Sequence, residues 1–153
     1  MPALFRSLSI VALVALTAPL AAFAAGTEDG SSAAATSSGT YADAKALIYA
    51  GKFAEARAIL KEVTAAEPAN ADAWNLLGFS ARKTGDLRAA SKAYSKALKL
   101  NPTHLGALEY QGEMYIQMGE IDKAKANLAA LQAACGTCEE MRDLQKALKA
   151  AGA

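Results

Sequence analysis

Small and apolar residues recur along most of the chain at one fixed spacing. Gly51, Gly85 and Gly119 are each 34 residues apart. Several other columns keep the same step and the same register, which indicates three copies of one structural unit. These columns are Ala44, Gly78 and Gly112; Leu47, Ala81 and Tyr115; Ala56, Ala90 and Ala124; Leu60, Tyr94 and Leu128; Val63, Ala97 and Leu131.

The columns predict two helices in each copy, joined by a turn that contains the repeated glycine. A glycine at the end of a helix readily takes the left-handed backbone that such a turn needs. The small residues allow the two helices to approach closely, and the larger apolar residues fill the space beside them. Pro68 and Pro102 end the second helices because proline cannot continue a helix, and Gly136 takes the third place.

The middle copy carries the motif Trp74-x2-Leu77-Gly78, then Ala90-x3-Tyr94, then Pro102. This motif resembles the tetratricopeptide repeat, whose period is also about 34 residues. The resemblance implies an all-α fold in which three helix-turn-helix repeats, about 37–70, 71–104 and 105–138, stack as a right-handed superhelix. It covers roughly two-thirds of the chain and rests on packing residues, so it points to the fold more than to a function.

The three copies depart from the family pattern at several positions. Ala81 stands where the family prefers Tyr, and Thr40 replaces the Trp of the first copy.

Downstream of the third copy, Met141, Leu144 and Leu148 form an apolar stripe in a segment rich in charged residues. We therefore expect a capping helix at about 139–150, which closes a repeat domain spanning residues 40–150.

The resemblance also implies that the first helix of each repeat lines a concave groove. The inner positions that do not contribute to packing would then be the partner-binding residues. Glu109 and Glu113 stand where a clamp for a terminal carboxylate would need basic residues, so such a clamp is not expected. The predicted groove residues are Tyr41, Lys45, Tyr49, Asn75, Phe79, Arg82, Lys83, Glu109, Glu113 and Gln117.

The start of the chain differs from the repeats. Residues 1–24 have one charge, Arg6, a short apolar run, and the small-x-small sequence Ala22-Phe23-Ala24. This is typical of a cleavable signal peptide and predicts a periplasmic or secreted protein with no membrane insertion after cleavage. A membrane anchor is the alternative, but Pro19 interrupts a stretch too short to span a bilayer. Residues 25–39 are mostly small and polar and predict a flexible leader.

Charge balance limits the classes of partner. The chain has 16 basic and 15 acidic residues, and loss of Arg6 would leave 15 of each. Nucleic acid or an anionic membrane surface is therefore not expected as the main partner. A local basic run should be a solvated face on the convex side of the middle repeat, and it consists of Arg88, Lys92, Lys96 and Lys99.

Cys135 and Cys138 form a Cys-x-x-Cys pair, the one motif in the sequence that suggests a specific chemistry. A disulfide that fastens the third repeat to the capping helix is the first interpretation, because lone cysteine pairs are commonly bridged in oxidising compartments. The same spacing occurs in redox-active pairs. Metal binding is the third interpretation, although two thiols and the single histidine, His104, make an incomplete zinc site. His104 itself is expected at the surface.

The sequence contains no hydrolase-type constellation and no glycine-rich phosphate loop, so we expect no enzyme, no cofactor and no metal. The favoured hypothesis is an exported adaptor that binds a protein or peptide in its groove. Two alternatives stay open. One is a participant in thiol–disulfide exchange that uses Cys135 and Cys138, and the other is a structural subunit that self-associates through its terminal repeats.

Overall fold

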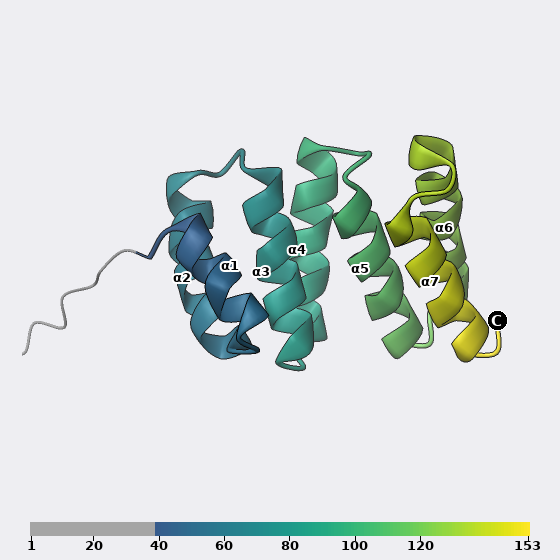
Figure 1. Cartoon of the computed structure of the whole chain (residues 1–153), viewed down its shortest axis with the longest axis horizontal. Coiled ribbons are helices and arrows are strands. Elements are labelled where there is room, and N and C mark those ends of the chain that lie inside the picture. The colour runs from purple at the N-terminus through teal and green to yellow at the C-terminus, as the bar shows by residue number, and fades with distance from the viewer. Residues whose placement is uncertain (1–38) are drawn as a thin grey trace, which may run out of the picture. The chain divides into compact units, whose positions relative to one another are not determined.

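The computed structural model of the chain describes residues 39–153, and the signal peptide and all but the last residue of the leader lie outside them. The described part contains seven α-helices (Figure 1). None of these is long and apolar enough to cross a membrane. The helices are α1 (Tyr41–Tyr49), α2 (Phe53–Ala66), α3 (Ala71–Lys83), α4 (Leu87–Leu100), α5 (Leu105–Gln117), α6 (Ile121–Cys135) and α7 (Glu139–Ala150).

Polar side chains fix where several helices begin. Thr40 and Asp43 form a capping box at α1, in which the Thr40 hydroxyl accepts from the Asp43 backbone N–H. Asn70 and Asp86 accept in the same way at the starts of α3 and α4. Within each pair of helices, the turn after the first helix contains the repeated glycine, and its backbone is left-handed as predicted, with φ of +84° at Gly85.

The helices form two layers with different contacts. Helices α1, α3, α5 and α7 each make close backbone contacts with the next one in that series, whereas α2, α4 and α6 make none with one another. Each helix of the second series packs instead between α1 and α3, α3 and α5, or α5 and α7 (Figure 1). The closer spacing of the first series makes its surface the inner, concave side. The predicted all-α stack of three helical pairs and a capping helix is confirmed.

Glycines allow two close contacts between helices. A Cβ atom at Gly78 of α3 would lie 2.6 Å from the ring of Tyr94, which is fully buried in α4. A Cβ atom at Gly112 of α5 would lie 2.5 Å from Leu144 of α7. The small-residue column therefore brings α3 against α4, and it also seats the capping helix on α5. Burial of Leu144 and Leu148 confirms the apolar stripe of that helix.

The outer layer presents the basic run to solvent. Arg88, Lys92 and Lys99 of α4 are exposed, and Lys96 is half-buried. None of them forms an ion pair within residues 39–153. The prediction of a solvated face on the second helix of the middle repeat is confirmed.

Candidate functional site

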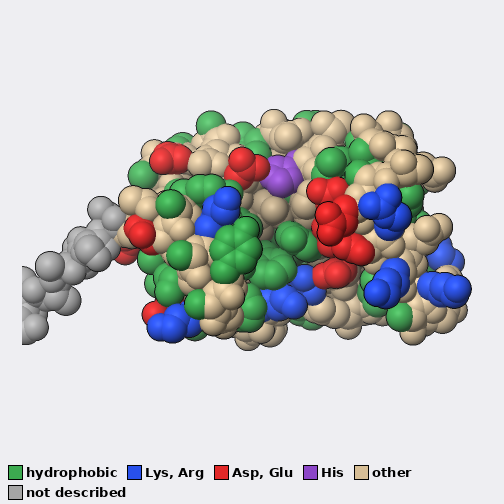
Figure 2. Space-filling view, viewed as in Figure 1, with side chains coloured by type: hydrophobic (Ala, Val, Ile, Leu, Met, Phe, Trp, Pro, Cys, Tyr) green, Lys and Arg blue, Asp and Glu red, His purple; other side chains and the backbone are tan. Residues whose placement is uncertain are grey.

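A pocket of about 120 Å³ opens on the inner face where α1, α3 and α5 meet. Its wall combines aliphatic, aromatic and basic side chains from three successive repeats. Figure 2 shows hydrophobic side chains gathered on this part of the inner face, with basic side chains beside them. The lining residues are Lys45, Ile48, Tyr49, Leu76, Phe79 and Tyr110.

Half of the residues in this wall are predicted groove residues. Lys45, Tyr49 and Phe79 were predicted groove residues, whereas Ile48, Leu76 and Tyr110 were not. Ile48 and Leu76 are half-buried and also pack around the core of the first repeat. The apolar pattern therefore indicates packing residues at these two positions and not binding residues. Tyr110 is the clearest omission, since it directly follows Glu109, a predicted inner residue.

Aromatic rings hold Phe79 at the centre of the pocket wall. Its ring centroid lies 4.8 Å from that of Tyr110, and the two planes are tilted by 49°. Phe53 of α2 meets Phe79 edge-on from behind, at 5.8 Å and 71°. Such tilted and edge-on pairs are favourable for aromatic quadrupoles. Neighbours on α2 and α5 therefore fix the orientation of Phe79, while Tyr49 is 84% exposed.

Arg82 lies behind the aromatic residues as a buried cation. Its guanidinium carbon is 5.5 Å from the centroid of Phe79 and 5.8 Å from that of Tyr110. The guanidinium also donates to the Glu113 carboxylate at 2.5 Å, and only 4% of the Arg82 side chain is exposed. A cation packed against two aromatic rings and paired with a carboxylate is held in one position.

Three further carboxyl groups gather beside Glu113 and form a group of four with it: Glu109 from α5, and Glu140 and Asp143 from α7. We call these four residues the acidic cluster. Figure 2 shows acidic side chains grouped next to the hydrophobic part of the inner face. The pKa of Glu109 is raised to about 8: burial is the largest cause, Glu113, Asp143 and Glu140 add to the rise, and Arg82 opposes it. Burial, followed by Glu109 and Glu113, also raises the pKa of Tyr110.

Three of the predicted groove residues are not free inner positions. Asn75, Arg82 and Glu109 are only 6%, 7% and 8% exposed, so the prediction that they do not contribute to packing is wrong. Neighbouring helices cover them because the inner helices lie close together. The buried Asn75 Oδ1 atom has no hydrogen-bond partner among residues 39–153. Lys45, Tyr49, Lys83 and Gln117 are exposed, and Tyr41 and Glu113 are half-buried.

His104 is also more enclosed than predicted, since only 12% of its side chain is exposed. Its Nδ1 atom accepts from the Ala107 backbone N–H and so caps α5. Its Nε2 atom lies 2.9 Å from the Asp72 carboxylate at the start of α3. The expectation of a surface histidine is therefore wrong, because this side chain joins the starts of two inner helices.

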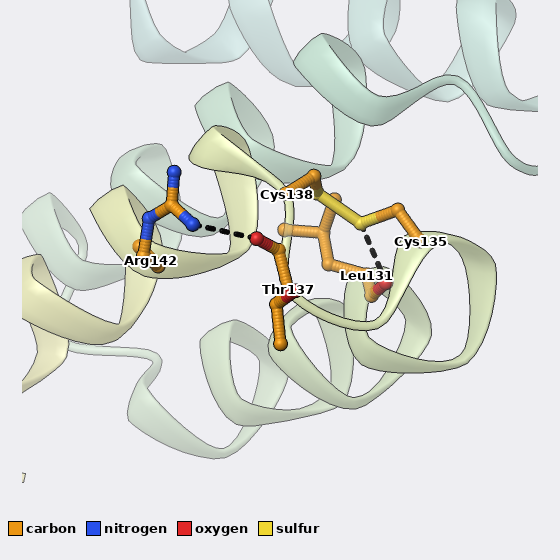
Figure 3. Close-up of a disulfide and its surroundings, with 5 residues drawn as sticks. All are labelled: Leu131, Cys135, Thr137, Cys138 and Arg142. Carbon is orange, nitrogen blue, oxygen red and sulfur yellow. Dashed lines mark hydrogen bonds between the residues drawn. A yellow bond between two sulfur atoms is a disulfide. The ribbon is translucent and has the colours of Figure 1, made fainter.

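Cys135 and Cys138 lie side by side where α6 passes into α7 (Figure 3). Their Cα atoms are 5.7 Å apart, a separation that a disulfide can bridge, and the sulfur atoms are at bonding distance. Arg142 of α7 donates to the Thr137 carbonyl in the intervening turn at 2.7 Å. Within residues 39–153, no three His, Cys, Asp or Glu side chains come together in a way that could hold a metal ion.

A stack of helical pairs with an open inner face defines the class of helical-repeat scaffolds. Residues 41–79 and residues 71–104 each match a family model described as a tetratricopeptide repeat. These two matches cover residues 41–104, and the chain therefore contains tetratricopeptide repeats.

The solved structures agree with this fold. One of 39 matching chains is the crystal structure of the TPR domain of P58(IPK), with a TM-score of 0.62 and 20% sequence identity. The match covers 71% of this chain and 30% of the other, so this chain spans less than a third of that structure. The comparison with curated proteins gave no match. The family is generally a non-catalytic scaffold for protein–protein interaction.

Proposed function

We propose that the chain is an exported adaptor that binds a segment of another protein along its inner face. The observation that carries this proposal is the pocket formed by α1, α3 and α5. Most aromatic side chains of the described residues are at least partly covered, yet Tyr49 at the pocket rim is 84% exposed. Exposed aromatic residues beside a preformed pocket are favoured anchors in protein interfaces.

The test uses two matched double variants and whatever extract proteins the parent captures. Lys45→Ser with Tyr49→Ser removes exposed side chains of the pocket wall without touching the fully buried core. Lys92→Gln with Lys99→Gln changes exposed side chains of the outer layer. We expect the first variant to lose the proteins that the parent retains and the second to keep them. Loss with the outer variant alone would exclude the inner face as the binding surface.

Export is the second part of the proposal and rests on the sequence of residues 1–24. The basic start, the apolar run and the small residues at positions 22 and 24 support a signal peptide that is cleaved after Ala24. Expression of the full chain in a Gram-negative host, followed by mass spectrometry of the periplasmic fraction, tests this. A mature protein that begins at Ala25 is the expected result, and an uncleaved cytoplasmic chain would contradict it.

A role in thiol–disulfide exchange is the second candidate. Cys138 is the N-cap residue of α7, and the positive end of a helix dipole favours negative charge such as that of a thiolate. The reduction potential of the Cys135–Cys138 pair separates the two functions. A value below roughly −300 mV is typical of a structural bridge, whereas a value near those of oxidoreductases supports exchange. We favour the structural bridge, because it joins the last outer helix to the capping helix.

A further inference from the structure

We propose that the bound segment is a peptide that places one apolar side chain in the pocket and a neighbouring Lys or Arg side chain over the acidic cluster. This rests on the proposed function of the inner face and adds the chemistry of the partner. Three observations support it: the size of the pocket, the distribution of charge beside it, and the contacts that join the two.

The size of the pocket favours a single side chain. Its volume of about 120 Å³ is well below the roughly 300–1,000 Å³ typical of sites for whole small molecules. Apolar and aromatic groups form most of its wall, and the ring of Phe79 is held in place by Phe53 and Tyr110. A preorganised apolar wall of this size suits an aliphatic or aromatic anchor from an extended peptide.

The charge beside the pocket favours a cation. Glu109, Glu113, Glu140 and Asp143 bring four carboxyl groups together, and Arg82 is the one cation that lowers the pKa of Glu109. Arg82 is already paired with Glu113 and is nearly inaccessible. Asp143 is exposed and Glu140 is half-buried, so these carboxylates of α7 remain open to a ligand. A second, incoming cation would relieve the repulsion within the cluster.

Tyr110 and Arg82 connect the pocket to the acidic cluster. The Tyr110 ring lines the pocket, and the next residue toward the start of α5 is Glu109. The Arg82 guanidinium touches the Tyr110 ring on one side and pairs with Glu113 on the other. The two subsites therefore share a wall. One extended peptide, which rises about 3.3 Å per residue, can occupy both with residues that are neighbours or nearly so.

The opposite side of the pocket carries positive charge. Lys45 of α1 lines the wall that lies away from α5, and its Nζ atom is 5.8 Å from the centroid of the Tyr41 ring. Lys45 is exposed. A basic residue on this side would be repelled, so the distribution of charge sets the orientation of the peptide as well as its composition.

The experiment measures binding of short synthetic peptides to the mature chain by fluorescence anisotropy. Every peptide has capped ends, which removes terminal charges. The test peptide contains one Phe followed closely by Arg, and two matched peptides replace Arg with Glu or Phe with Ser. We expect the Phe–Arg peptide to bind best, and its affinity to fall as salt increases because the contact with the acidic cluster is partly exposed.

Two matched variants assign the contact. Glu140→Gln with Asp143→Asn should weaken the Phe–Arg peptide roughly tenfold at low salt and leave the Phe–Glu peptide unaffected or bound more tightly. Lys146→Gln with Lys149→Gln on the same helix is the control, since these residues face the α6 side in a different pocket. Calorimetry in buffers of different ionisation enthalpy should also detect proton release on binding near neutral pH, from Glu109.

The outcomes separate this inference from the proposed function. Equal binding of the Phe–Arg and Phe–Glu peptides, abolished by Tyr49→Ser, would overturn the cationic preference and leave the inner face as a binding surface. Binding that Tyr49→Ser does not change would overturn both. A Phe–Arg preference that is lost in the α7 carboxylate variant and kept in the Lys146 and Lys149 control supports both.

Discussion

The inner and outer faces of the stack treat charged side chains differently. On the inner face, Arg82 and Glu109 are buried against neighbouring helices. On the outer face, Arg88, Lys92 and Lys99 remain in solvent. Burial of a charge costs free energy unless the charge is paired or neutralised. The inner side chains are therefore held in defined positions at a cost that the outer side chains avoid, and fixed side chains are what selective recognition requires.

The largest effect is expected where the two layers press together. Tyr94→Ala should lower the free energy of unfolding by about 3–5 kcal/mol, because the fully buried ring fills the space over Gly78. Urea unfolding followed by circular dichroism measures this. Ser95→Ala, on the exposed side of the same helix, is the matched control and should change stability by less than about 0.5 kcal/mol. Similar losses in both variants would contradict the layered packing described above.

Substitution of one arginine on each face compares how much an ion pair contributes to stability there. Arg82→Met should cost about 2–4 kcal/mol because it leaves Glu113 beside three other carboxyl groups without its cation. Arg57→Met removes the ion pair between Arg57 of α2 and Asp86, and these two side chains are 23% and 42% exposed. This change should lower the free energy of unfolding by about 1 kcal/mol or less. Urea unfolding at low and high salt measures both. An equal cost for the two variants would mean that burial on the inner face contributes nothing.

The pH dependence of stability gives a third contrast. The pKa of Glu109 is raised to about 8 in the folded chain, above its ordinary value of 4.5. The folded state therefore holds this proton more tightly, and the stabilisation is complete below pH 4.5 and is lost as the pH rises toward 8. Glu109→Gln should consequently be more stable than the parent by about 1–3 kcal/mol near pH 8.5 and similar to it near pH 4.

Thermal unfolding at a series of pH values measures this difference. Glu62→Gln on the exposed surface of α2 is the control from the outer layer and should show no such pH-dependent gain. If the Glu109 variant tracks the parent across the whole range, the carboxyl group is ionised in the fold and the burial argument fails.

The smallest effect is expected at the end of the stack, where the cysteine pair lies between the last outer helix and the capping helix. The double change Cys135→Ser and Cys138→Ser should cost on the order of 2 kcal/mol or less, because the bridge would close only a short loop. Addition of a reductant to the parent chain should give the same loss. A reductant that changes nothing, with the thiols titrating as free, would show that no bridge forms.

The repeat itself could be read from the sequence because its constraints are local and repeated. The glycine turns, the small residues of the 34-residue columns and the terminating prolines each need a particular residue type at a particular place. The same reasoning placed the capping helix, since Leu144 and Leu148 keep a helical spacing. These features depend little on which residues occupy the rest of each helix.

The candidate site was only partly predictable because it depends on contacts between repeats. Family geometry located Lys45, Tyr49 and Phe79 on the inner face, but periodicity within one helix cannot show that Tyr110 reaches the ring of Phe79 from the next repeat. It also cannot show that α7 contributes Glu140 and Asp143 beside Glu109. The sequence signal for the site was the alternation of charged and aromatic residues at the inner positions. Which of these side chains are buried depends on how many neighbouring helices surround each one.

The lack of close backbone contacts among α2, α4 and α6 has a mechanical consequence for the described domain. Bending that moves these helices apart separates no closely packed outer backbones, although it strains the Arg57–Asp86 ion pair between α2 and the start of α4. Most of its cost therefore falls on the contacts that α1, α3, α5 and α7 make. A stack joined in this way is more compliant on one edge than on the other. Bending of this kind would change the curvature of the inner surface, while the hydrophobic interior of each helical pair stays intact.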